Sequence, residues 1–343
     1  IISRSVSMNV DTKEKRYNRA KEISTPNGFI NTELKIDGTN QSISVSEFIG
    51  KKVILLDFWT YTCINCQRTT PYLNAWYEKY KDKGLVIIGI HTPEFEFEKK
   101  YENVRAATEK MGIKYSIVMD NDYSTWNAYK NNYWPRKYLI DIDGFIVYDH
   151  IGEGAYQETE KRIQELLNER MEVLGEEGTI TAPLSEVLSD TPGKGELRSP
   201  EIYFGSSRNE LLANGKRGVV GTQQFTAPAS LALDQLNLVG EWNIQKEYAE
   251  NKSKGEFQDK IVFRYRAKDV YFVASSAAST TVEVWRDGVK VGGSAGSSVR
   301  SGEVLIKDSN LHHLIHEPQG SSEHTLELRI KGPGLKAFTF TFG

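Results

Sequence analysis

A pair of cysteines after an apolar segment constrains this chain more than any other feature of its sequence. Residues 53–56 read Val-Ile-Leu-Leu, a run typical of a buried parallel strand. Cys63 and Cys66 follow, and from residue 72 to residue 80 apolar side chains recur at the three- and four-residue spacing of a helix. A Cys-x-x-Cys motif between a strand and a helix is the pattern of a redox dithiol. We therefore predict a redox-active dithiol at a strand-to-helix junction.

The position of each cysteine predicts its role in thiol chemistry. A helix N-terminus carries unpaired backbone N–H groups and a partial positive charge, which favour the thiolate of Cys63. Cys63 is therefore the predicted nucleophile, and Cys66, one turn deeper, is the predicted resolving thiol. The alternatives are a structural zinc site and a pair of inert core thiols. Because zinc needs four ligands and the sequence has no second cysteine pair, we predict no metal, and no cofactor other than the Cys63–Cys66 disulfide.

Residues 59–73, WTYTCINCQRTTPYL, resemble the thioredoxin-like part of DipZ-type proteins. Those proteins are bacterial fusions of a membrane electron carrier to an extracytoplasmic thioredoxin-like domain. Asp57 lies six residues before Cys63, where thioredoxins carry a buried acid associated with proton transfer. Trp134-Pro135 resembles the segment that holds a cis-proline beside the dithiol. The order of strand, helix and Trp-Pro segment along the chain is also that of the family.

The resemblance also implies a location and partners. It implies an extracytoplasmic protein, in the periplasm or at the outer face of the inner membrane, that is tethered in its full-length form. The implied partners are a membrane electron carrier of the CcdA kind and disulfide-bonded extracytoplasmic proteins. Electrons arriving from that carrier would make the chain a reductase. Because the sequence begins with Ile1 rather than Met, we expect a processed protein or an excised fragment.

Asp57 interrupts an otherwise apolar strand, where a carboxylate is costly to desolvate. We interpret it as a proton acceptor for Cys66, with a pKa raised by burial; an acid at a strand edge with local hydrogen bonds is the alternative. His91 ends the next predicted strand, and we interpret it as a packing residue rather than a proton donor. The residues expected to form the rim of the dithiol are Trp59, Thr62, Ile64, Asn65, Trp134 and Pro135. For Trp59 and Trp134 the alternative is a place among the core aromatics, and for Pro135 it is a trans proline in a surface turn.

The sequence pattern changes from alternating strands and helices to strands alone after about residue 200. The predicted fold class is an α/β thioredoxin-like domain followed by an all-β jelly-roll sandwich domain. Polar and charged residues predict a linker or tether at residues 1–23, and a segment rich in Gly, Pro, Ser and Glu predicts a second linker at residues 173–200. The thioredoxin-like domain is expected at residues 24–172 and the β-sandwich at residues 201–343.

The expected β-sandwich resembles the distal module of DipZ-type proteins, which is similar to carbohydrate-binding modules. The resemblance makes cell-wall carbohydrate a candidate ligand, and a scaffold or docking surface is the alternative. Aromatic side chains stack on sugar rings, but burial in the core is the default for such residues. The candidates for sugar binding are Trp242, Tyr265, Tyr271 and Trp285.

Composition and the remaining histidines argue against several other classes of protein. The net charge is −3 with acids and bases mixed along the chain, which leaves no basic footprint for nucleic acid. No apolar run approaches the ~18 residues that a membrane-spanning helix needs. His312, His313 and His316 are spaced like zinc ligands, but they lie in a predicted strand without the glutamate base of a metalloprotease. We predict no metal site there.

These observations predict an extracytoplasmic thiol–disulfide oxidoreductase that works through Cys63 and Cys66. One alternative is a peroxiredoxin-like thiol peroxidase, because peroxiredoxins share the fold. Their pattern places a proline seven residues before the reactive cysteine, with a threonine between. Here Thr60 fits, but Leu56 stands at the proline position and argues against it. A glycan-binding or targeting protein with accessory redox activity is the other alternative.

Overall fold

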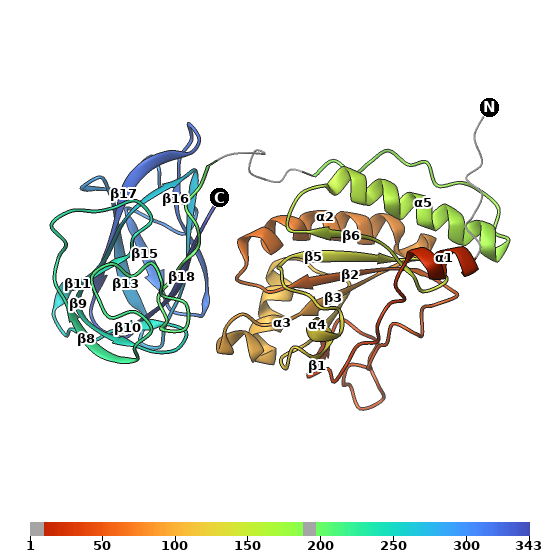
Figure 1. Cartoon of the computed structure of the whole chain (residues 1–343), viewed down its shortest axis with the longest axis horizontal. Coiled ribbons are helices and arrows are strands. Elements are labelled where there is room, and N and C mark those ends of the chain that lie inside the picture. Colours follow the sequence, from red (N-terminus) through yellow and green to blue (C-terminus); the bar gives the residue numbers. More distant parts are fainter. Residues whose placement is uncertain (1–9, 188–196) are drawn as a thin grey trace. The chain divides into compact units, whose positions relative to one another are not determined.

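The computed structural model describes residues 10–187 and 197–343, and the chain divides into two compact units (Figure 1). Unit 1 is Ile1–Thr191 and unit 2 is Pro192–Gly343. Among the residues described, no helix combines the length and the apolarity that crossing a membrane requires. The boundary between the units falls inside the segment 173–200 that the sequence analysis expected to be a linker.

A six-stranded sheet forms the centre of unit 1, in the strand order β1-β4-β3-β2-β5-β6. The strands β2, β3 and β4 are parallel to one another, whereas β1, β5 and β6 each run antiparallel to the neighbour that they pair with. This arrangement confirms the predicted α/β thioredoxin-like domain. The strands are β1 (Gly28–Ile30), β2 (Val53–Trp59), β3 (Leu85–His91), β4 (Ser116–Met119), β5 (Arg136–Ile140) and β6 (Ile146–Ile151).

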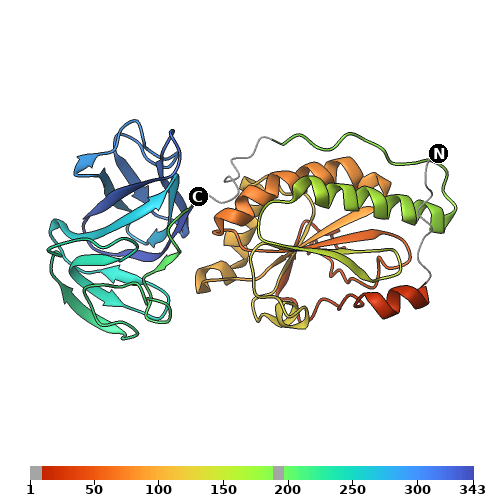
Figure 2. The same cartoon turned by 45° about the horizontal axis from the view of Figure 1, so that its top comes forward.

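Helices cover the sheet of unit 1 on both faces (Figures 1 and 2). All seven residues of β2 are buried, and because side chains alternate along a strand they enter two separate hydrophobic clusters. Leu55 lies in the cluster that contains residues of α2 and α5, and Leu56 in the cluster that contains Trp126 of α4. The helices are α1 (Val10–Arg16), α2 (Ile64–Tyr80), η1 (Lys81–Lys83), η2 (Glu96–Lys99), α3 (Tyr101–Lys110), α4 (Ser124–Ala128) and α5 (Tyr156–Leu174).

The described part of the N-terminal segment is folded onto unit 1, contrary to the linker expected at residues 1–23. Residues 10–16 form α1, and the ammonium of Lys13 is buried within 2.7 Å of carboxylate oxygens of Asp141, Asp143 and Glu169. The backbone of residues 18–20 then hydrogen-bonds to residues 144–146. Sequence composition could not predict that this segment is folded onto unit 1. The segment is polar, and ion pairs of Lys13, rather than a row of apolar side chains, hold it in place.

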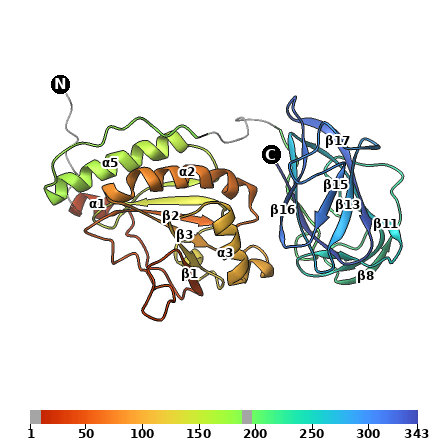
Figure 3. The same ribbon diagram turned by 180° about the vertical axis from the view of Figure 1, so that it is seen from behind.

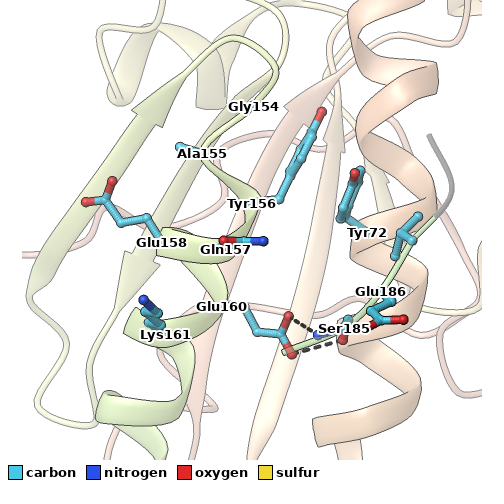
Figure 4. Close-up of a pocket in the computed structure, with 11 residues that line it drawn as sticks. Tyr72, Gly154, Ala155, Tyr156, Gln157, Glu158, Glu160, Lys161, Ser185 and Glu186 are labelled. Atoms are coloured by element: carbon cyan, nitrogen blue, oxygen red, sulfur yellow. Dashed lines mark hydrogen bonds between the residues drawn. The ribbon is translucent and has the colours of Figure 1, made fainter. Parts of the chain in front are cut away.

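The described beginning of the second expected linker also lies against unit 1. The main chain at Ile180 exchanges two hydrogen bonds with the side chain of Asn168 on α5. Further on, the carboxylate of Glu160 accepts hydrogen bonds from both the backbone N–H and the hydroxyl of Ser185 (Figure 4). Residues 175–187 are therefore a strap along α5. The rest of the expected linker, up to residue 196, lies outside the described residues.

Unit 2 is a single curled antiparallel sheet of twelve strands (Figures 1 and 3). Its main path has the order β14-β13-β17-β11-β9-β10-β18-β12-β16, and β15, β7 and β8 pair with β13, β18 and β9. The prediction of an all-β second domain is thus confirmed. The strands are β7 (Ile202–Tyr203), β8 (Gly221–Phe225), β9 (Asn237–Ile244), β10 (Ala249–Asn251), β11 (Glu256–Ala267), β12 (Asp269–Ser276), β13 (Thr280–Arg286), β14 (Val289–Lys290), β15 (Glu303–Ile306), β16 (Asn310–His316), β17 (Ser322–Lys331) and β18 (Leu335–Phe342).

Strand β9 bends in its middle, and its two halves pair with different strands of the sheet of unit 2. Residues 237–239 pair with β11, whereas residues 242–244 pair with β10. Gly240 lies between these two stretches with a φ of 94°. A Cβ atom there would come within 1.9 Å of Oδ1 of Asp259, a buried carboxylate that accepts hydrogen bonds from Glu241, Asn251 and Ser253. Only glycine fits this bend without displacing Asp259 from its donors.

We predict that Gly240→Ala destabilises unit 2 by about 3 kcal/mol or more, because it combines a disfavoured φ with loss of the Asp259 hydrogen bonds. Gly288→Ala is the matched control, since Gly288 has a φ of 79° but open space where its Cβ would be. That control should cost only about 1 kcal/mol. Hydrogen–deuterium exchange of the full chain, read separately for the two units, measures both effects. Equal costs for the two variants would contradict this account of the bend.

Candidate active site

The two cysteines lie at the N-terminus of helix α2, as the sequence predicted. Cys63 is the N-cap residue, in an extended conformation, and its Sγ accepts a hydrogen bond of 3.3 Å from the backbone N–H of Cys66. Both thiols are free; Cys63 is half-buried and Cys66 is buried. Cys63 is thus the more accessible sulfur and also receives an N–H group from the first helical turn, which stabilises a thiolate.

Burial makes the second cysteine a poor acid. The pKa of the Cys66 thiol is raised well above its usual range by burial, and its hydrogen bond with Cys63 and the nearby charge of Asp57 raise it further. A thiol of this kind stays protonated until a base removes its proton. The two sulfurs therefore differ in access, and the buried one is held as a thiol, as a resolving cysteine needs to be.

Asp57 is a buried carboxyl group, on the strand that leads to the dithiol. It is 2% exposed, and its Oδ1 has no hydrogen-bond partner among the described residues. Burial raises the pKa of Asp57 to about 7, and the charge of Lys137 counteracts part of this effect. The group can therefore gain and lose a proton near neutral pH, which a proton acceptor for Cys66 has to do; the role itself stays a prediction.

Lys137 is a second buried ionisable residue at the site, and sequence reasoning did not identify it. It lies directly opposite Asp57 in the pairing of β5 with β2, and its Nζ donates a hydrogen bond of 3.1 Å to the carbonyl of Gly152. Burial lowers the pKa of Lys137, while the charges of Asp57 and Cys66 act in the opposite direction. In the sequence Lys137 follows Arg136 at the charged start of β5, which gave no sign that its side chain is buried.

Glu98 holds the residue that precedes the dithiol, and it too was missed in the sequence. Its buried carboxylate accepts hydrogen bonds from the hydroxyl of Thr62 at 2.6 Å and from the Thr62 backbone N–H at 3.3 Å. It also accepts hydrogen bonds from the backbone N–H groups of Glu94 and Phe95. Burial raises the pKa of Glu98. The short turn of η2, which ends before α3 begins, is what brings Glu98 to Thr62.

The expected rim residues separate into exposed and buried ones. Asn65 and Trp134 are half-buried, and Nε1 of Trp134 donates a hydrogen bond of 3.1 Å to the carbonyl of Thr92. Trp59 is only 2% exposed and belongs to the core, so its assignment to the rim was wrong. The other expected rim residues, Thr62, Ile64 and Pro135, are buried as well, and the peptide bond between Trp134 and Pro135 is cis.

His91 is a packing residue at neutral pH, as the sequence analysis interpreted it. It is fully buried, and its ring lies edge-on to Trp59 and stacks on Tyr61. Burial lowers the pKa of His91 to about 3. The imidazole is therefore neutral at pH 7 and is not the imidazolium that would act as an acid toward a leaving thiolate. Asp57, with a pKa of about 7, is a buried group near the dithiol that does titrate in the physiological range.

Two of the four aromatic residues proposed for sugar binding are excluded from that role by burial. Trp242 and Tyr265 are fully buried in the core of unit 2. Tyr271 is 9% exposed, and the ring of His313 is stacked on it. Trp285 is half-buried on β13, with the guanidinium of Arg329 over its ring. The alternation of apolar and polar residues along a predicted strand could not show which of these four aromatic side chains face the core.

A groove on unit 1 is separate from the dithiol. It is lined by residues of α2, of the first turns of α5 and of the strap, among them Tyr72, Tyr156 and Glu186 (Figure 4). The rings of Tyr72 and Tyr156 are stacked with their centroids 3.6 Å apart. Neither cysteine, nor Trp134 or Pro135, lines this groove. The thiol chemistry therefore takes place elsewhere on the unit.

The chain matches two family models, one on each unit. Residues 20–149 match the AhpC/TSA family, and residues 199–343 match the family described as thioredoxin like C-terminal domain. The DipZ proteins of Mycobacterium bovis and Mycobacterium tuberculosis are each 36% identical to the chain over 304 residues, or 89% of this chain. The chain spans only 40% of the length of these two relatives. These matches confirm the resemblance to DipZ-type proteins.

Other similar proteins match a smaller share of the chain. The thiol-disulfide oxidoreductase YkuV of Bacillus subtilis is 27% identical over 130 residues, which is 38% of this chain and 87% of YkuV. Among solved structures, a thiol:disulfide interchange protein of the thioredoxin family from Chlorobium tepidum TLS covers 43% of this chain and 99% of its own, at 20% identity and a TM-score of 0.33.

The raised pKa of Asp57 predicts a pH-dependent gain in stability for Asp57→Asn. Between pH 3.8 and about 7 the unfolded chain loses this proton first, so the wild type loses stability as pH rises through that window. The variant avoids this loss, which amounts to at most about 4 kcal/mol. Urea unfolding at pH 5 and pH 8, followed by tryptophan fluorescence, should show the advantage of the variant growing with pH.

Asp82→Asn is the control for this experiment, since it removes one negative charge from an exposed position on η1. A stability gain of Asp57→Asn that is the same at both pH values, or that the Asp82 variant shares, would contradict the buried carboxyl described above.

Proposed function

This chain is a homologue of the DipZ proteins, and we propose that it is a thiol–disulfide oxidoreductase that works through Cys63 and Cys66. The observation that carries the proposal is the asymmetry of the dithiol. Cys63 is half-buried at the helix N-terminus, whereas Cys66 is buried with a raised pKa, next to an acid that titrates near pH 7. Homology to a protein named as a thiol-disulfide oxidoreductase, over much of unit 1, supports the same activity.

The first step is attack on a disulfide of the substrate. The Cys63 thiolate displaces one substrate sulfur, so that a Cys63–substrate disulfide forms as the substrate disulfide breaks. The displaced sulfur leaves as a thiolate and takes a proton from solvent. The N–H of Cys66 that points to Sγ of Cys63 stabilises the attacking charge. Glu98 positions this step through Thr62, because it fixes the backbone just before Cys63.

The second step resolves the mixed disulfide. Asp57, as a carboxylate, accepts the proton of the Cys66 thiol, and the Cys66 thiolate attacks Sγ of Cys63. The Cys63–Cys66 disulfide forms, and the second substrate sulfur is released as a thiolate. In total the substrate gains two electrons and the protein loses two. Lys137, opposite Asp57, favours the carboxylate form before the transfer.

We further propose that the chain acts outside the cytoplasm as a reductase. In this proposal a membrane electron carrier of the CcdA kind returns two electrons to the Cys63–Cys66 disulfide, and disulfide-bonded extracytoplasmic proteins are the substrates. The support is the homology to DipZ proteins, which extends over both units and 89% of the chain. The greater part of each DipZ protein lies outside the matched region, where a carrier could be joined to this chain.

A thiol peroxidase is the less well supported function. Peroxiredoxins place a proline seven residues before the reactive cysteine, and here that position is Leu56, which is fully buried in the middle of β2. A proline there would remove a hydrogen-bond donor from a central strand that pairs on both sides. The fold of this strand thus favours the disulfide chemistry of a dithiol over peroxide chemistry of a single cysteine.

Trapping the mixed disulfide tests the proposed activity. With insulin as the substrate, Cys66→Ser should accumulate a covalent adduct on Cys63, because the resolving thiol is missing. Wild-type protein, reduced beforehand, should instead release reduced insulin, and Cys63→Ser should form no adduct. Non-reducing gels and mass spectrometry measure all three results. An adduct on Cys66 in the Cys63→Ser variant, at the yield seen for Cys66→Ser, would refute the assigned roles.

For unit 2 we propose cell-wall carbohydrate as the ligand, with Trp285 as the stacking residue that remains accessible. Its ring is half-buried, and charged side chains of Glu283, Lys290 and Arg329 surround it. Trp285→Ala should reduce retention of the chain on insoluble cell-wall polysaccharide several-fold. Tyr248→Ala is the control, since that half-buried ring also lies under a cation. Undiminished retention of the Trp285 variant would exclude this site.

A further inference from the structure

Three potential metal ligands converge on the surface of unit 2. They are Asp269 at the start of β12 and His313 and His316 of β16. Oδ1 of Asp269 lies 2.9 Å from Nε2 of His313 and 2.7 Å from Nδ1 of His316. The candidate ligand atoms of the three residues all lie within 4.8 Å of one another. We refer to these three residues as the Asp-His-His cluster.

A β-bulge creates the cluster. Residues three apart on a regular strand point to opposite faces of the sheet, so His313 and His316 would be separated. In the pairing of β12 with β16, however, Val270 lies opposite Ile315 and Tyr271 lies opposite His313, so that Leu314 is the extra residue. The two histidines therefore face the same side as Asp269, which lies opposite His316. Bulges next to functional sites commonly change the face of the sheet to which a side chain points.

The surroundings hold the three side chains in place. Asp269 exchanges backbone hydrogen bonds with Gly343, which fixes the start of β12. The ring of His313 stacks on Tyr271 with centroids 4.5 Å apart. Its other nitrogen, Nδ1, accepts a hydrogen bond of 3.3 Å from the backbone N–H of Ser297 and lies 3.2 Å from the Ser297 hydroxyl. When Nε2 binds a metal ion, the proton moves to Nδ1, and the hydroxyl oxygen of Ser297 is then its acceptor.

We propose that the Asp-His-His cluster binds a divalent transition metal ion, with Zn²⁺ as the representative of this class. One carboxylate and two neutral imidazoles are a common ligand set for zinc, at bond lengths of about 2.0–2.2 Å. Tetrahedral coordination at these lengths separates the ligand atoms by about 3.3 Å, so the two contacts to Oδ1 need to lengthen by only a few tenths of an ångström.

The exposure of the cluster leaves the metal open to solvent on one side. The Asp269 side chain is 4% exposed, whereas those of His313 and His316 are 19% and 35% exposed. Three protein ligands with an accessible fourth position are typical of zinc sites that hold a water molecule or a substrate group, and four protein ligands of purely structural ones. The geometry therefore assigns to unit 2 an open metal site, independent of the dithiol.

Isothermal titration of the untagged full chain with ZnCl₂ tests this site. The titration uses a Cys63→Ser/Cys66→Ser background, because the dithiol itself would bind zinc. We expect one equivalent of zinc to bind, and Asp269→Asn and His316→Gln each to weaken the affinity at least about tenfold. His324→Gln is the matched control, because His324 also contacts a carboxylate, that of Asp287, but belongs to no such cluster. It should bind zinc like the parent.

Thermal unfolding with and without zinc gives a second test of binding that does not depend on calorimetry. Zinc that binds the folded chain should raise the unfolding temperature of the parent but not of His316→Gln. His316 has the most exposed side chain of the three, so its replacement disturbs the core of unit 2 least. The proposal is overturned if no saturable binding occurs up to roughly 100 μM zinc, or if the affinity is unchanged in both cluster variants. The cluster would then be a hydrogen-bonded network only.

Discussion

The burial of strand β2 on both faces is the constraint on which the active site of unit 1 depends. Alternate residues of the strand fill two different hydrophobic clusters, and none of its seven residues is exposed. Asp57 is the one acidic residue in this strand, and the same loss of water raises its pKa and that of Cys66. The desolvation that holds the sheet together thus also creates a proton acceptor and a protonated resolving thiol side by side. Catalysis and packing in this unit share one physical cause.

The sequence predicted those features that follow from local pattern. An apolar run, a Cys-x-x-Cys motif and a helical period, together with the resemblance to DipZ-type proteins, were enough for the thioredoxin-like fold, for the position of Cys63 at a helix N-terminus and for the burial of Asp57, and all three are present. The same reasoning was wrong for Trp59, which we placed on the rim. In a strand that is covered on both faces, even the last residue before the catalytic turn can be part of the core.

Features that depend on contacts between distant residues could not be predicted in this way. Lys13 is anchored by carboxylates more than 120 positions away in the chain, and composition alone made its segment look like a linker. Glu98 lies on a short 3₁₀ helix and contacts Thr62, which lies 36 positions earlier in the chain. The cluster of Asp269 with His313 and His316 requires a bulge, and no strand period reveals a bulge. Each case involves a polar group whose partner is fixed by tertiary structure.

The most direct measurement of the central claim is the reduction potential of the Cys63–Cys66 disulfide. It can be obtained by equilibration with thiol redox buffers, with tryptophan fluorescence as the signal, because Trp59 lies in the same hydrophobic cluster as Cys66. A chain that delivers electrons to substrate disulfides should have a potential near or below about −270 mV, as thioredoxin does. A potential near about −120 mV would place the chain with strong oxidants and contradict the reductase account.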